Sequence, residues 1–364
     1  MKKGLYILFV VILFLPMLSQ LVDWPIIVSL YGYTKDVDEA PSLSVRGVTQ
    51  RTWQDSTERF INSQMNVRPA YVRFRNFFDY ELFDEVHVQR VFKGKENYLF
   101  NASEAYMNGY GNVGIAQIEK NVIRLKQIQD SLRKEGKPLL FVIAPEKVFV
   151  YPEYLPDRLP LKDTVRFMYD NYCRLFQENS IDVIDFNAWY LQIKDTAHFE
   201  IFARGGKHWT DYYASIAFDS IGDRLRGFGV SVPDVIHRKA EQIEKPRGLD
   251  VDTWRSANLP FSHETGNFAI PVLTVETGPK SKILMAADSY INVIAWGSQF
   301  NSQFHASSEF WYYNKEMIGL DLISKGSPKQ SDFNQLNPEL DAYVILVSVG
   351  NISYFDYKFL EYFD

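Results

Sequence analysis

The sequence predicts an α/β domain built on a mainly parallel sheet with helices on both faces. Short apolar runs of strand length, such as 139–144 and 343–349, are bounded by polar or turn-forming residues. Between such runs, longer segments repeat apolar residues every three or four positions, as 115–132 does. Strands and helices therefore alternate along the chain. This order is typical of parallel sheets, because each return to the sheet needs a crossover connection.

Composition limits the possible function classes. The chain has 364 residues, of which 46% are hydrophobic and 23% charged, so it is long enough for a sizeable core and is not disordered. Its net charge of −6 argues against a general nucleic-acid binder, which would carry a basic face. The single cysteine, Cys173, excludes an intramolecular disulfide and a thiolate metal cluster. The histidines other than His208 show no metal-ligand spacing, and we expect neither a metal nor a cofactor.

The first 21 residues read as a targeting segment. Lys2 and Lys3 precede an apolar run over 5–18, and no small-x-small cleavage site follows. We expect a signal anchor, with a cleaved signal peptide as the alternative, and a polar linker over 22–47. Residues 5–21 would then anchor the protein to the inner membrane with its body in the periplasm. If the segment is cleaved, the body is released into the periplasm.

The remaining chain, 48–364, reads as one domain with an N-terminal part (48–110) and an α/β core (111–364). In the N-terminal part, a helix over 53–83 is broken or kinked by Pro69, and a hairpin covers 91–100. The stretch 227–280 is rich in Pro and Gly and is either an insertion or a pair of antiparallel elements. The expected core elements are helices at 115–132, 164–176 and 210–225, and strands at 139–144, 181–186, 282–287 and 343–349.

One strand ends in a serine that is a candidate nucleophile. The buried run Ile283–Ala287 is followed by Asp288 and Ser289, at the edge of the sheet where parallel strands deliver functional side chains. If a helix opens there, backbone N–H groups surround the hydroxyl and provide the elements of an oxyanion site. Asp288 is expected to shape the turn, because adjacent residues rarely present their side chains to one point.

A histidine in a second stretch is a candidate base. His208 lies between the pair Gly205-Gly206 and Trp209, directly ahead of a helix capped by Thr210. Trp209 is expected to pack under this loop, with stacking on a sugar at the rim of the site as the alternative. Serine becomes a good nucleophile when a base such as histidine takes its proton.

Several motifs together resemble the alginate O-acetyltransferase AlgJ and AlgX family, over roughly residues 45–364. The combination of an N-terminal anchor with these motifs carries the resemblance. They are Lys95-Glu96-Asn97-Tyr98-Leu99-Phe100, Phe141-Val142-Ile143-Ala144-Pro145-Glu146-Lys147, Tyr151-Pro152-Glu153-Tyr154-Leu155-Pro156, Gly205-Gly206-Lys207-His208-Trp209 and Ala287-Asp288-Ser289.

The resemblance implies a fold, a reaction and a partner. It implies an SGNH-hydrolase-like three-layer fold with His208 ahead of Ser289, a permuted order. It also implies O-acetylation of an exported polysaccharide through an acetyl-serine, with Ser289 as nucleophile and His208 as base. An MBOAT-type membrane acyltransferase would supply the acetyl group.

The chain departs from the family at the acid. The family has an aspartate two residues before the histidine, and this chain has Gly206 there. Without a carboxylate the imidazole loses the group that fixes its tautomer. Three explanations are open. A carboxylate from elsewhere, such as Asp211 or Asp185, replaces the missing aspartate, or the site works as a Ser-His dyad. In the third, the protein has lost catalysis and is a binding module.

Two further questions stay open at the level of sequence. Glu146 and Lys147 follow a strand, and Lys147 is a candidate for the rim of the site or a solvated strand end. The reaction itself has an alternative, because the same residues would make a polysaccharide acetylesterase if water replaced the sugar hydroxyl. A non-catalytic module that binds glycan or the membrane acyltransferase is the third hypothesis.

Overall fold

The chain forms two compact units. The structure, a computed structural model, describes residues 2–19, 29–32, 39–65, 67–101, 113–159, 163–260, 264–296 and 299–364. The first unit contains Met1–Val88 and Trp254–Ser262, and the second contains Gln89–Thr253 and His263–Asp364. The division falls earlier than the sequence boundary at 110/111, so the predicted hairpin belongs to the second unit.

The first unit is helical. The predicted helix over 53–83 is two helices, and Pro69 lies in the first turn of the second, where its missing N–H costs no helical hydrogen bond. In this unit the Asn76 amide donates to the Ala257 carbonyl at 2.8 Å, and the rings of Tyr80 and Trp254 pack edge to face at 5.3 Å. The helices are α1 (Lys2–Ser19), α2 (Val45–Thr49), α3 (Thr52–Gln64) and α4 (Arg68–Phe83).

The predicted targeting segment coincides with α1. Its apolar side chains are exposed, among them Leu5, Ile7 and Phe9. Across the described ranges, no helix combines the length and the apolarity that crossing a membrane requires. Residues 20–28 and 33–38 of the predicted anchor and linker lie outside the described residues.

A six-stranded sheet forms the centre of the second unit. Its order is β4-β3-β10-β7-β8-β9, and all neighbours are parallel except β8 and β9. β3, β7 and β10 are buried along their whole length, as expected for strands covered on both faces. The predicted mainly parallel sheet is therefore confirmed. The strands are β3 (Leu139–Ala144), β4 (Val183–Asp185), β7 (Ile283–Ala287), β8 (Glu309–Tyr312), β9 (Glu316–Gly319) and β10 (Ala342–Ser348).

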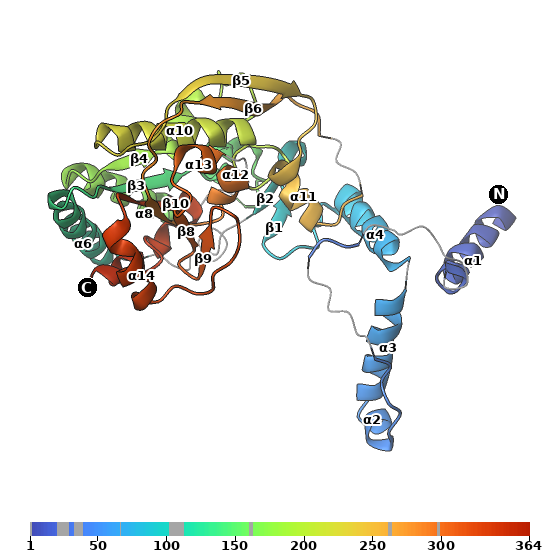
Figure 1. Cartoon of the computed structure of the whole chain (residues 1–364). Helices are drawn as coiled ribbons and strands as arrows, with labels where there is room; N and C mark the ends of the chain where they lie inside the picture. Colours follow the sequence, from blue (N-terminus) through green and yellow to red (C-terminus); the bar gives the residue numbers. More distant parts are fainter. Residues whose placement is uncertain are drawn as a thin grey trace. The chain divides into compact units, whose positions relative to one another are not determined.

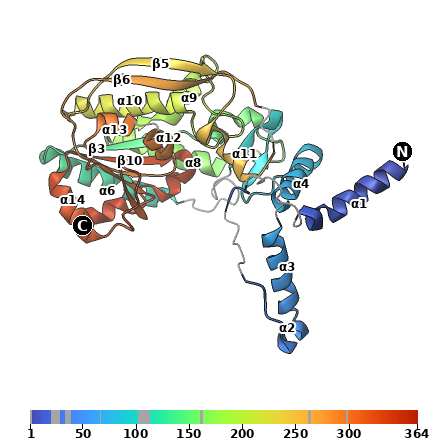
Figure 2. The ribbon, with the colours of Figure 1, turned by 45° about the vertical axis from the view of Figure 1, so that its right-hand side comes forward.

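Helices cover both faces of this sheet, which gives three layers (Figures 1 and 2). One face carries α6 (Ile115–Lys134), α8 (Asp163–Glu178) and α14 (Gln330–Leu336). The other carries α9 (Phe186–Ile193), α10 (Asp211–Gly227), α12 (Ile291–Trp296) and α13 (Gln299–Gln303). The short helices α7 (Lys147–Val150) and α11 (Asp252–Ser256) lie in connections.

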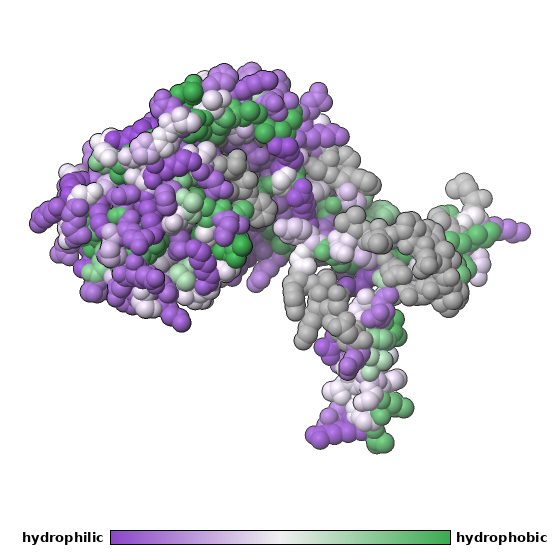
Figure 3. All heavy atoms as spheres, viewed as in Figure 1, coloured by the Kyte–Doolittle hydropathy of each residue, from purple (hydrophilic) through white to green (hydrophobic). Residues whose placement is uncertain are grey.

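Two antiparallel ribbons complete the second unit. The first is the predicted hairpin, β1 (Val91–Lys93) with β2 (Leu99–Asn101). The second, β5 (Val235–Ile243) with β6 (Phe268–Val275), lies above α10 and corresponds to the stretch expected as an insertion or antiparallel elements. In Figure 3 the surface of this unit is largely hydrophilic, with hydrophobic residues along the ribbon, where Ile236 and Val272 are exposed.

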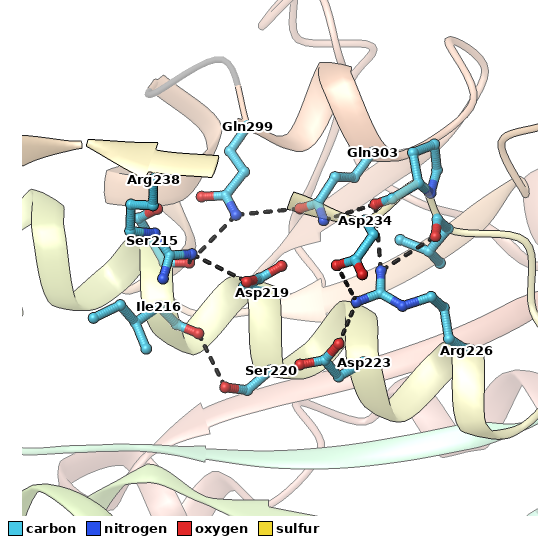
Figure 4. Close-up of polar contacts among 12 residues, drawn as sticks. Ser215, Ile216, Asp219, Ser220, Asp223, Arg226, Asp234, Arg238, Gln299 and Gln303 are labelled. Carbon is cyan, nitrogen blue, oxygen red and sulfur yellow. Dashed lines mark hydrogen bonds and ion pairs between the residues drawn. The ribbon is translucent and has the colours of Figure 1, made fainter. Parts of the chain in front are cut away.

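A polar network joins α10 to the ribbon and to α13 (Figure 4). The Arg238 guanidinium, on β5, donates to the Ser215 carbonyl at 3.2 Å and to the Asp219 carboxylate at 3.2 Å. The Gln299 amide donates to the same carbonyl at 3.3 Å and to Gln303 at 3.2 Å. These contacts hold the helix that begins directly after the histidine loop.

The carboxyl ends of four parallel strands meet at one edge of the sheet. Glu146 and Lys147 follow β3, Ser289 follows β7, Tyr313 follows β8, and β10 ends at Ser348. In open α/β sheets the residues at this edge form the functional crevice. The side chains of the candidate site come from these ends and from two loops beside them.

Candidate active site

A histidine and a serine that lie 81 positions apart form a hydrogen bond at this edge. His208 Nε2 lies 2.9 Å from the hydroxyl oxygen of Ser289. Both side chains are buried, with only 6% and 9% of their surface exposed. The structure thus brings together the two residues selected as base and nucleophile, in the geometry that proton transfer between them requires.

The other ring nitrogen of His208 contacts a carboxylate that the sequence did not indicate. Asp252 Oδ2 lies 2.8 Å from His208 Nδ1. Asp252 Oδ1 accepts from the Lys207 N–H at 2.8 Å and from the Thr253 hydroxyl at 3.1 Å. One carboxylate therefore holds the ring and the backbone beside it. It places the ring proton on Nδ1, which leaves Nε2 to accept the proton of Ser289.

Electrostatics keep Asp252 ionised. Burial alone would raise the pKa of this carboxyl. The hydrogen bond and charge of His208, with the bonds from Lys207 and Thr253, outweigh burial and hold the pKa below its usual value. An ionised carboxylate is the form that stabilises an imidazolium.

The two carboxylates proposed from the sequence lie elsewhere, so we correct that expectation to Asp252. Asp185 Oδ1 caps α9 by accepting from the Ala188 N–H at 2.9 Å, and its Oδ2 accepts from the Tyr169 hydroxyl at 2.7 Å. Asp211 is the first residue of α10, where a negative charge favours the helix. Of the alternatives left open, the geometry supports a carboxylate supplied from elsewhere in the chain.

The glycine at the position of the family's aspartate makes room for the substitute. A Cβ on Gly206 would lie 2.6 Å from the Asp250 carbonyl oxygen, closer than such atoms approach. Asp250 belongs to the short helix Gly248–Val251, directly ahead of Asp252. The segment that delivers Asp252 therefore crosses where a side chain at position 206 would begin.

Lys147 is buried and binds the backbone of the histidine loop. It does not lie on a solvated rim. Only 3% of its surface is exposed, which corrects the expectation of a rim residue. Its ammonium donates to the carbonyls of Leu99 (2.9 Å), Ala203 (2.6 Å), Arg204 (2.7 Å) and Gly206 (2.8 Å). Three of these carbonyls belong to the five residues before His208, so the lysine fixes the loop backbone.

Other contacts close the same loop. Phe202 and Trp209 form an antiparallel bridge across it, and the Glu264 carboxylate accepts from the N–H groups of Arg204 and Gly205. Trp209 is fully buried, and its indole N–H donates to the Tyr290 carbonyl at 3.2 Å. Trp209 thus packs under the loop and ties it to the serine turn.

Asp288 shapes the serine turn. Its Oδ1 accepts from the Tyr290 N–H at 3.1 Å. Its Oδ2 accepts from the Ser348 N–H at 2.7 Å, the Asn351 amide at 3.0 Å and the Tyr357 hydroxyl at 3.1 Å. The buried carboxylate therefore joins the ends of β7 and β10.

Other titratable groups near the site also have displaced pKa values, and burial lowers the pKa of Lys147 to about 7. Burial raises the pKa of Glu146 to about 7. Burial opposes the charge of Lys207, but the charges around it, among them the carboxylates of Glu146, Asp288 and Asp252, outweigh burial and raise its pKa above the usual value. The residue next to His208 thus carries a stable positive charge.

Sequence reasoning missed two residues of this site. Asp252 lies in a stretch without a motif, and its contact with His208 depends on the path of the 248–252 segment. Tyr313 follows β8, a strand that the sequence did not indicate, and its hydroxyl donates to Ser289 Oγ at 3.3 Å. A predicted strand over Glu309–Tyr312 would have placed Tyr313 at the functional edge.

Among the described residues, one group could hold a metal ion: Asp79, Glu85 and His87 in the first unit. His87 Nε2 already lies 2.6 Å from Asp79 Oδ2, and Arg75 pairs with the same carboxylate. An ion pair accounts for this cluster without a metal.

Comparisons with known proteins found similar sequences and structures. Residues 91–247 match the family model described as "SGNH hydrolase-like domain, acetyltransferase AlgX". That stretch includes His208 and ends before Asp252 and Ser289. The solved O-acetyltransferase domain of Pseudomonas putida AlgJ is 17% identical and covers 72% of this chain and 92% of its own, with a TM-score of 0.48.

Two curated relatives are named probable alginate O-acetylases. The chain is 25% identical over 224 residues to the "probable alginate O-acetylase AlgJ" of Pseudomonas syringae pv. tomato, covering 61% of this chain and 53% of that protein. It is 27% identical over 150 residues to the protein of the same name in Pseudomonas aeruginosa, covering 41% and 36%. The chain spans about half the length of the first of these relatives. The chain is thus similar to AlgJ proteins and, over residues 91–247, to the AlgX family model.

Proposed function

We propose that this protein is an O-acetyltransferase that moves acetyl groups onto hydroxyls of an exported cell-envelope polysaccharide, through an acetyl-Ser289 intermediate. One observation carries the proposal: the hydrogen-bonded series from Ser289 through His208 to Asp252. The AlgJ relatives, named as probable alginate O-acetylases, support the reaction class.

The proposed chemistry follows from the roles of the three residues. His208 takes the proton of Ser289 as the hydroxyl oxygen attacks the acetyl carbon of the donor, and returns it to the leaving oxygen. Asp252 stabilises the imidazolium and keeps the ring in register. In the second half the acceptor hydroxyl attacks acetyl-Ser289, with His208 again as base. The acceptor must reach the site ahead of water, because water in its place would give an acetylesterase.

The donor and location are further proposals. We infer that an MBOAT-type membrane acyltransferase supplies the acetyl group, and that residues 5–21 anchor the protein to the inner membrane with its body in the periplasm. The Lys2-Lys3 flank and the apolar run behind it support this location. Recovery of the mature protein from the soluble periplasm with an N-terminus near residue 20 would overturn the anchor.

The test of function is a covalent intermediate on the full-length protein in detergent. Incubation with a chromogenic acetyl ester, followed by intact-mass measurement, should reveal one added acetyl group on the native protein and none on Ser289→Ala. Ser302→Ala, a serine on α13, is the matched control and should be acetylated like the native protein. Equal acetylation of Ser289→Ala would contradict the proposal. Adding polysaccharide then tells transfer from hydrolysis by where the acetyl group goes.

A further inference from the structure

A tyrosine contacts the hydroxyl of the candidate nucleophile in addition to His208. The Tyr313 hydroxyl donates to Ser289 Oγ at 3.3 Å. A serine hydroxyl has one proton to give and lone pairs to accept with. The bonds can therefore run in one direction, from Tyr313 to Ser289, from Ser289 to His208 and from His208 to Asp252.

The backbone of Tyr313 is held in an uncommon conformation to make this contact. Its φ is +50°, in the left-handed region that bulky residues rarely adopt. Its N–H donates to the carbonyl of Ala287, the last residue of β7, at 2.8 Å. Strain of this kind tends to be found at functional sites, where the surrounding structure maintains it.

A second tyrosine repeats the pattern at the same turn. Tyr357 has a φ of +54°, and its hydroxyl donates to Asp288 Oδ2 at 3.1 Å. The rings of Tyr313 and Tyr357 pack edge to face at 5.3 Å, and the Asn314 amide donates to the Tyr357 carbonyl at 3.1 Å. The two left-handed tyrosines therefore support each other, and both hydroxyls are directed at the Asp288–Ser289 turn.

We propose that Tyr313 is a catalytic residue that donates a side-chain hydrogen bond to the oxyanion formed when Ser289 attacks an acyl group. The inference rests on the proposed function. In the free protein the Tyr313 hydroxyl donates a hydrogen bond to Ser289 Oγ. After the attack, the oxyanion is attached to the carbon that is covalently bonded to Ser289 Oγ. A small rotation of the hydroxyl carries the bond from one oxygen to the other. The Ser289 N–H, which meets no acceptor among the described residues, is the backbone donor of the same site.

The step balances without further reactants. As the bond from Ser289 Oγ to the acyl carbon forms, the carbonyl π electrons move to oxygen and the hydroxyl proton goes to His208 Nε2. Tyr313 and the Ser289 N–H hold the oxyanion. Collapse restores the carbonyl, breaks the bond to the donor's oxygen and returns the proton from His208 to that oxygen. Tyr313 keeps its own proton throughout.

A nearby cation favours the same charge. Lys207 precedes His208 in the sequence, and the carboxylates of Glu146, Asp288 and Asp252 help to keep its ammonium charged. A positive charge close to the developing oxyanion lowers its energy in a site that excludes water. Lys207 would therefore act on the oxyanion through the electrostatic effect of its charge and not through a hydrogen bond.

The test compares Tyr313→Phe with Tyr312→Phe in the full-length protein. Tyr313→Phe keeps the ring against Tyr357 and should lower kcat/KM for a chromogenic acetyl ester on the order of 10²-fold, with an unchanged melting temperature. Tyr312→Phe removes a neighbouring hydroxyl that does not contact Ser289, and should stay within about twofold of the native rate.

The outcomes separate this inference from the proposed function. A Tyr313→Phe rate within threefold of native, beside a Ser289→Ala variant that has lost turnover, overturns the role of Tyr313 and leaves the function standing. Turnover retained by Ser289→Ala overturns the function itself. If Tyr313→Phe does not fold, a structure of the native protein with a boronic acid bound to Ser289 decides. The Tyr313 hydroxyl should lie about 3 Å from a boronate oxygen, and a hydroxyl turned away refutes the inference.

Discussion

At the scale of single residues, the site shows why a nucleophile and a base can be read from sequence more easily than an acid. Ser289 and His208 are indicated by their immediate neighbours, a buried strand and a Gly-Gly pair. Asp252 lies 44 positions from His208, and nothing in the residues around it indicates the contact. Gly206 was the visible sign of a change, because it removes the expected carboxylate. The structure shows in addition that the lack of a side chain at Gly206 leaves room for the 248–252 segment, which carries Asp252.

Asp252→Asn should nearly abolish turnover. An asparagine amide in the same place favours the wrong tautomer of His208, and the comparable change in serine proteases lowers the rate by about 10⁴-fold. Acetyl-ester turnover with a matched Asp211→Asn control checks this, since Asp211 does not contact His208 and its variant should be active. A fully active Asp252→Asn variant would refute Asp252 as the acid.

Gly206→Asp should not rescue that loss. Its Cβ would lie 2.6 Å from the Asp250 carbonyl oxygen, so the new side chain displaces the 248–252 segment before it can reach His208. We expect the double variant Gly206→Asp/Asp252→Asn to be no more active than Asp252→Asn and to melt at a lower temperature. Restored turnover in the double variant would show that the two positions are interchangeable.

At the scale of elements, apolar periodicity predicts the buried part of the fold and misses its edge. β3, β7 and β10 are continuous apolar runs, and the sequence places each within a residue or two. β8 and β9 have four residues each, begin with a glutamate and form the end of the sheet, so their apolar runs are too short to stand out from the surrounding loops. The histidine loop contains neither a helix nor a strand, only the bridge between Phe202 and Trp209. Its shape depends on contacts with Lys147 and Glu264, which lie far away in sequence.

Lys147→Met should loosen this loop. Removing the ammonium takes a donor from four carbonyl groups. The carbonyls of Ala203 and Arg204 keep the backbone N–H groups of Gly206 and Leu99 as donors. Each buried group that is left without any partner costs about 1–3 kcal/mol. We expect a lower melting temperature and at least a tenfold loss of turnover, because His208 follows the released segment. Lys194→Met is the control: Lys194 donates to the Val150 carbonyl at 3.1 Å, away from the loop, and its variant should keep native turnover. Equal turnover in both variants would refute the positioning role.

At the scale of the whole molecule, the sheet gathers groups from distant parts of the chain at one buried edge, and burial there has a cost. Ser289, Asp288, Lys147 and Glu146 all follow strands that end at this edge. The sequence predicts that edge, because parallel strands deliver their ends together. It does not predict which charges become buried, since burial depends on how the loops close over them. Glu146, with only 4% of its surface exposed, is the clearest case.

Glu146 should make stability depend on pH between about 4.5 and 7. Burial raises the pKa of Glu146 in the folded protein to about 7, from a usual value of 4.5. Below pH 4.5 the carboxyl is neutral in both states and nothing is lost. As pH rises towards 7, the unfolded chain releases this proton first. The unfolded state is therefore stabilised relative to the folded state, and the free energy of unfolding falls. The full cost, roughly 3 kcal/mol, is present above pH 7.

Glu146→Gln removes this titration and keeps an amide oxygen that can accept from the Gly350 N–H. Denaturant unfolding at pH 5 and pH 8 should show that the variant gains stability relative to the native protein as pH rises. Glu153→Gln, a partly exposed glutamate paired with Lys194, is the control and should follow the native pH dependence more closely. If the native protein and Glu146→Gln lose or gain stability in parallel between these pH values, Glu146 ionises freely in the folded state and the edge of the sheet is open to water.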